Sequence, residues 1–122
     1  MDLVMRLFLT FDSNEFQEEY IKFLDRNFTD YDAYVKAYGL KGLFKIFPFF
    51  EALGIMPNRK IVSIDLVQQL YSQSIHIMWE KSKPIREGMR KKYNQPNWWE
   101  WFEYLYNEIE KREQGKNHRR LN

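Results

Sequence analysis

Cysteine is absent from the 122-residue sequence, and histidine, glycine and proline are scarce. Without cysteine the chain can form no disulfide, thiolate zinc site, iron–sulfur cluster or cysteine nucleophile. Two histidines leave little material for metal or acid–base chemistry, and five glycines disfavour a glycine-rich phosphate loop. The sequence also lacks the GxSxG, P-loop, GxGxxG and HExxH motifs. We therefore expect no cofactor, no metal ion and no catalytic activity.

A strong charge of one sign is also missing, because 19 Lys+Arg against 17 Asp+Glu leave a net charge of +2. This balance gives no argument for a nucleic-acid or membrane partner. The apolar start lacks the basic leader of a signal peptide. The other apolar stretch, 43–56, is shorter than the about 20 residues that span a bilayer and is interrupted by Lys45, Pro48 and Glu51. We expect a cytoplasmic protein without membrane insertion.

Aromatic residues are abundant, with 4 Trp, 8 Tyr and 10 Phe, and hydrophobic residues make up 44% of the chain. That content excludes wholesale disorder, and the length suits one domain with one core. Apolar residues recur at helical spacing, which predicts an all-α, compact bundle of six to seven helices. We expect a single helical domain over 1–113 and a polar basic tail over 114–122.

The central helix is expected near 43–53, where apolar residues occur on every face. Pro48 predicts a kink in this helix or a restart of it, and Gly54 predicts its end. The four residues expected at the centre of the core are Phe44, Phe47, Phe50 and Leu53.

Local signals predict the other helices and their ends. Ser13, Thr29 and Ser63 are expected to cap helices near 14–25, 30–38 and from 63 on, and Gly39 to end the second of these. The last helix is expected from Pro96 to about Glu113, ended by Gly115. Between residue 63 and the last helix we expect a break near 72–74, a kink at Pro84 and a loosening at Gly88.

One ordered set of short motifs resembles a known family. It comprises Phe49-Phe50-Glu51-Ala52-Leu53-Gly54, Arg59-Lys60, Ile64-Asp65-Leu66-Val67, Trp79-Glu80, Pro84 and Trp101-Phe102-Glu103-Tyr104-Leu105. The pattern, over residues 13–110, resembles small prokaryotic helical domains known only as a domain of unknown function. The resemblance implies a helical fold and brings no catalytic residues with it. Pro48 departs from the family pattern, so the resemblance does not define the exact course of the central helix.

Two arrangements could carry chemistry. His76 and Glu80 lie at i, i+4 and can share a helix face, as two metal ligands would, but local spacing supplies no third ligand. Paired acids such as Asp30 and Asp32 can perform acid–base chemistry when they line a cleft. Solvated helix ends explain such acid pairs more simply. Because the third metal ligand is missing, we expect His76 to be structural.

Basic residues gather in one segment, although the total charge is balanced. Residues 81–92 contain six cations, of which Lys83, Arg86 and Arg90 are expected on one helix face. Such a face can bind phosphates or an acidic protein surface. Alternatively, it faces the acidic residues 1–38 of the same chain or of a second copy. The candidate residues are Lys81, Lys83, Arg86, Arg90, Lys91 and Lys92.

The last predicted helix carries more aromatic surface than one core-facing stripe requires. Trp99 and Tyr106 lie beside that stripe with Glu103 and Glu110, a combination typical of protein interfaces. Alternatively, this helix has a wide core face that the N-terminal helices cover.

We therefore predict a non-catalytic protein–protein interaction or regulatory accessory domain. Self-association as a homodimer is one form that this interaction can take. The alternative is a nucleic-acid-binding module that uses segment 81–92. A metal- or acid-dependent hydrolase is a third hypothesis.

Overall fold

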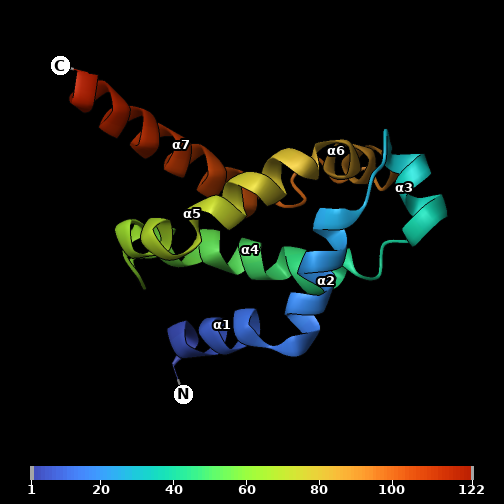
Figure 1. Ribbon diagram of the computed structural model, residues 1–122, viewed down its shortest axis with the longest axis horizontal. Coiled ribbons are helices and arrows are strands. Elements are labelled where there is room, and N and C mark those ends of the chain that lie inside the picture. Colours follow the sequence, from blue (N-terminus) through green and yellow to red (C-terminus); the bar gives the residue numbers. More distant parts are fainter. Residues whose placement is uncertain (1, 122) are drawn as a thin grey trace.

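The computed structural model describes residues 2–121, with side chains for residues 2–115. Seven helices and no strand occur in this part of the chain, which confirms the all-α prediction. Figure 1 shows α4 in the interior, with α5 crossing beside it and α7 extending beyond the other helices. The helices are α1 (Leu3–Asp12), α2 (Asn14–Asp25), α3 (Tyr31–Tyr38), α4 (Leu43–Asn58), α5 (Ile64–Lys81), α6 (Lys83–Lys92) and α7 (Glu100–Leu121).

Several helix ends follow the local signals. The hydroxyl oxygens of Ser13 and Ser63 accept hydrogen bonds from backbone amides in the first turns of α2 and α5, and Gly39 ends α3 with φ 73°. The Thr29 prediction is wrong, because the carboxylate of Asp30 caps α3 by accepting from the amide of Ala33 at 2.7 Å.

The breaks in the second half differ from the prediction. α5 is continuous through 72–74, and the chain breaks at Ser82 instead. Pro84 explains this position, because proline lacks an amide hydrogen and its ring clashes with the preceding helical turn. α7 begins at Glu100 instead of Pro96, and it continues past Gly115 through the predicted tail. Glycine ends a helix only where it adopts a positive φ, and Gly115 does not.

The core forms around α4, which contacts α1, α2, α5 and α7. Phe47, Phe50 and Leu53 are buried as predicted, whereas the Phe44 prediction is wrong, since this ring is 47% exposed. α4 passes through Pro48, whose ring lies on the exposed side. The carbonyl of Phe44, which has no amide donor at residue 48, also lies in that exposed turn.

Gly54 lies within α4 and does not end it. A Cβ atom at this position would lie 2.0 Å from the carbonyl oxygen of Trp101, in the first turn of α7. Gly88 similarly allows α6 to approach Tyr31 of α3. The two glycines thus permit close helix packing instead of ending or loosening helices.

The start of α7 is capped from a distant helix. Glu51 of α4 accepts a hydrogen bond from the amide of Phe102 through Oε1 at 2.7 Å. Burial raises the pKa of the Glu51 carboxyl, and hydrogen bonds from the amides of Phe102 and Trp101 oppose this rise. The folded protein therefore binds this proton more tightly than the unfolded chain does. Glu51 consequently favours folding most at low pH, and this contribution declines as pH rises above about 4.3.

Two substitutions separate the cap from its charge. Glu51→Gln retains an oxygen acceptor for the amide of Phe102 and removes the buried charge, so the free energy of unfolding at neutral pH should be unchanged or higher. Glu51→Ala removes the acceptor and should lower it by about 1 kcal/mol or more. Urea unfolding of both variants at acidic and neutral pH provides the measurement. Equal destabilisation by the two substitutions would contradict the capping role.

Candidate functional site

The basic segment 81–92 forms the end of α5 and all of α6, and one of its cations is buried. Arg86 is 4% exposed. Its Nε donates to Oγ of Ser82 at 2.9 Å, and its Nη2 donates to the carbonyl of Trp79 at 2.7 Å. Its guanidinium carbon lies 3.2 Å from the centroid of the Trp79 ring, as in a cation–π contact. Arg86 therefore satisfies polar groups that are left open where α5 ends.

Arg86 forms no ion pair with any carboxylate whose side chain the structure describes. Burial and the charge of Arg90 together lower the pKa of Arg86 to about 10, although nearby glutamates oppose this shift. The cation is held mainly by its two hydrogen bonds and the indole ring, so it is unavailable as an exposed charge.

Two further cations of the segment also have partners within the chain. Nη1 of Arg90 lies 2.9 Å from Oε1 of Glu103, and Nε of Arg90 donates to the carbonyl of Trp98 at 2.7 Å. Nζ of Lys81 donates to the carbonyl of Leu24 at 2.5 Å, and burial lowers the pKa of Lys81. Both side chains therefore stabilise contacts between helices.

The exposed basic face predicted from Lys83, Arg86 and Arg90 is not formed, because α6 packs Arg86 into the interior beside Ile85 and Met89. Lys83, Lys91 and Lys92 remain exposed. The hollow beside α6 contains three cations and three carboxylates, so its charge is balanced. Its lining residues are Trp79, Glu80, Lys83, Arg86, Glu87, Arg90, Glu103, Tyr106 and Asn107.

The buried position of Arg86 predicts a structural effect of its loss. Arg86→Ala should lower the free energy of unfolding by about 2–3 kcal/mol, because it removes two buried hydrogen bonds and the contact with the Trp79 ring. Arg86→Lys should not restore it fully, since an ammonium cannot reproduce the two-pronged donor geometry. Lys83→Ala, at an exposed position, is the control and should change little. Thermal unfolding of the three variants is the measurement, and equal melting temperatures for Arg86→Ala and Lys83→Ala would contradict this role.

The aromatic interface candidates pack within the chain. The ring of Trp99 lies 4.9 Å from that of Phe47 in a T-shaped contact, and Trp99 adopts φ 65° directly before α7. Tyr106 stacks on Trp79 at 5.8 Å and donates a hydrogen bond to Glu80. That hydrogen bond raises the pKa of Tyr106 to about 12. α7 is covered by both α4 and α5, as the wide core-face alternative supposes, although the covering helices are not the N-terminal ones.

The acidic interface candidates also have partners within the chain. Glu103 pairs with Arg90, and Oε1 of Glu110 lies 2.8 Å from Nδ1 of His76. The hydrogen-bond partner of His76 is therefore Glu110 of α7 and not Glu80. Among the residues whose side chains are described, no three His, Asp or Glu side chains are grouped to hold a metal ion.

An apolar stripe, which the sequence alone did not reveal, lies on the outer face of α5. Leu66, Leu70 and Ile77 are 38–45% exposed, and Gln73 between them is exposed as well. At 100° per residue the four positions fall within about 60° around the helix. Their spacing of four, three and four residues is that of a coiled-coil seam. We call Leu66, Leu70, Gln73 and Ile77 the α5 stripe.

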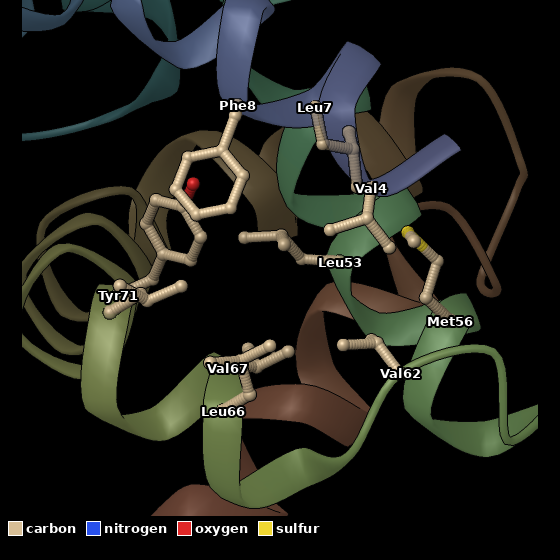
Figure 2. A pocket seen from close by; sticks show the side chains of 10 residues that line it. Val4, Leu7, Phe8, Leu53, Met56, Val62, Leu66, Val67 and Tyr71 are labelled. Atoms are coloured by element: carbon tan, nitrogen blue, oxygen red, sulfur yellow. The ribbon is translucent and has the colours of Figure 1, made fainter. Parts of the chain in front are cut away.

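An apolar cavity lies beside the stripe, between α1, α4 and α5. In Figure 2 Val4 and Phe8 of α1 face Leu66 and Tyr71 of α5 across it. The enclosed space is about 20 Å³, which suits one water molecule and no larger ligand. The cavity therefore shows where α1 adjoins the α5 stripe, and it is not itself a ligand site.

The spacing of the stripe was readable in the sequence, but its exposure was not. In the sequence, Leu70 follows Val67 and precedes Tyr71 at helical spacing, so the three positions look alike. Only the packing of α1 and α4 against α5 shows that Val67 and Tyr71 are buried while Leu70 is exposed.

Comparison with known protein families covers most of the chain. A family model described as a domain of unknown function, DUF4760, matches residues 2–109. The chain belongs to the DUF4760 family. No curated protein and no solved structure matches it. The DUF4760 match includes all of the α5 stripe and the charged hollow, and it confirms the resemblance seen in the motifs. None of the described helices combines the length and apolar character needed to cross a membrane.

Proposed function

We propose that this DUF4760 domain is a non-catalytic protein-binding domain whose contact surface is the α5 stripe. The observation that supports the proposal is the line of three exposed, large aliphatic side chains on one face of a well-packed helix. Contiguous exposed apolar surface is typical of protein contact sites. Helices that bind other helices use this i, i+4, i+7, i+11 spacing.

A nucleic-acid-binding role receives less support. Three of the six cations in segment 81–92 have partners within the chain: Lys81, Arg86 and Arg90. Of the three exposed lysines, Lys83 lines a hollow whose charges balance, and Nζ of Lys92 lies 6.0 Å from the centroid of the Tyr31 ring. Phosphate binding depends on a net excess of exposed cations, which this arrangement does not supply.

The experiment compares two isoleucines of equal exposure. Ile77→Asp places a charge in the stripe. Ile61→Asp, at a residue 46% exposed in the α4–α5 loop, is the matched control. Ile61 lies outside the α5 stripe and lines a hollow with Tyr104 and Glu108 of α7. Gel filtration of native extracts containing each tagged protein reports the size of its complexes.

Wild type and Ile61→Asp should elute above the monomer mass, whereas Ile77→Asp should elute as the folded monomer. Circular dichroism and melting temperature check the fold of each variant. Elution of wild type as a monomer, both in extract and when purified, would overturn the proposed function.

A further inference from the structure

We propose that the partner of the α5 stripe is a second copy of this chain, with the two α5 helices antiparallel about a two-fold axis. The inference rests on the proposed function, because it names the occupant of the same surface. It depends on three features of the surface: the register of the stripe, the apolar character of the adjoining helix, and the area that two copies would bury.

The register of the stripe is self-complementary. Antiparallel pairing centred between Leu70 and Gln73 places Leu66 opposite Ile77 of the second copy, and Leu70 opposite Gln73 of the second copy. Each layer then joins one a-type position to one d-type position, as antiparallel coiled coils do. The same two layers recur on the other side of the axis, as an isologous two-fold interface requires.

The polar residue of the stripe suits this arrangement. The two Gln73 side chains occupy adjacent layers on either side of the axis. An amide carries both donors and an acceptor, so two copies of it can bond each other. A single polar residue in an apolar seam also specifies register at some cost in stability.

The flanks of the stripe favour the antiparallel orientation over the parallel one. One flank is α1, where Met5 and Leu9 are 50% and 51% exposed and follow Val4 and Phe8 around the helix. The other flank is polar and includes His76 and α7. An antiparallel two-fold axis places the α1 flanks of the two copies together, whereas a parallel axis would set α1 against the polar flank. Opposed helix dipoles also favour the antiparallel pair.

The area sets the expected strength. The half-exposed side chains of the stripe, with Met5 and Leu9, would bury on the order of 500 Å² per copy, or about 1,000 Å² in total, the lower bound for a specific interface. We therefore expect a dimer that forms in the micromolar range, so the purified protein should be studied at high micromolar concentration.

Cysteine pairs test the register directly, because the natural chain has no cysteine. Leu66→Cys and Ile77→Cys are prepared as separate full-length proteins and oxidised alone and mixed. The antiparallel dimer brings residue 66 of one copy to residue 77 of the other, so only the mixture should give a disulfide-linked dimer on a non-reducing gel. Lys22→Cys, at an exposed position on α2, is the control for collisional cross-linking, and mixed with Leu66→Cys it should give little dimer.

Each outcome decides the inference. Cross-linking in the Leu66→Cys and Ile77→Cys mixture, with little in either protein alone, supports it. Efficient cross-linking of each protein alone would indicate a parallel pair and overturn it. No cross-linking above the Lys22→Cys control would also overturn it. If the wild type still forms an Ile77-dependent complex in extract, the partner is then a different protein and the proposed function stands.

Discussion

Gly54→Ala is expected to lower the free energy of unfolding by about 3 kcal/mol or more, at the upper end of overpacking effects. The new Cβ would meet the carbonyl oxygen and carbon of Trp101 at 2.0 and 2.7 Å. These are backbone atoms, so relief requires a shift of α7 against α4, the most extensive helix contact in the described structure. The Glu51 cap on the amide of Phe102 resists that shift.

Gly115→Ala is the matched control, because a Cβ at Gly115 meets no atom within 4 Å. Alanine is favoured over glycine in a helix by about 1 kcal/mol, so this variant should be as stable as wild type or more stable. Urea denaturation measures both. A Gly54→Ala protein with an unchanged unfolding midpoint would show that α4 and α7 do not approach as closely as described.

Phe50→Ala is expected to lower the free energy of unfolding by about 3–5 kcal/mol, enough to unfold much of a domain of ordinary stability. Phe50 is fully buried and stacks on Phe102 with ring centroids 4.7 Å apart. It also contacts the ring of Phe49 at 5.2 Å. The cavity left by the ring is enclosed by helices that cannot collapse independently of one another.

Phe44→Ala provides the comparison within the same helix. Its ring is 47% exposed, and its centroid lies 6.5 Å and 5.9 Å from those of Trp98 and Trp99. Phe44→Ala should therefore lower the free energy of unfolding much less. Melting temperatures by circular dichroism rank the two variants. A Phe50→Ala protein as stable as Phe44→Ala would refute the position of the core.

Local signals in the sequence were enough to predict the fold class and many helix ends. Ser13, Ser63 and Gly39 act through bonds or dihedral angles within their own turns, so neighbouring residues suffice to recognise them. Gly54 and Glu51 could not be understood in this way. Their roles depend on α7, whose first turn lies about fifty residues further along the chain.

The candidate site was predicted less well for the same physical reason. Composition and spacing showed that cations gather in segment 81–92, but not that Arg86 would be buried on Trp79. The face of α7 with Trp99 and Tyr106 looked like a surplus because the sequence does not show that both α4 and α5 cover it. Whether an apolar position is covered depends on tertiary packing, which also decided the exposure of Leu70.

The central claim is that the α5 stripe is a binding surface, and the mass of the purified protein in solution tests it most directly. Sedimentation equilibrium of wild type, Ile77→Asp and Ile61→Asp should be measured from low to high micromolar concentration. The account predicts that wild type and Ile61→Asp approach the dimer mass as concentration rises, while Ile77→Asp remains at 15.1 kDa within the small change that the substitution makes. Dimers of equal strength in all three proteins would place the contact elsewhere and contradict the claim.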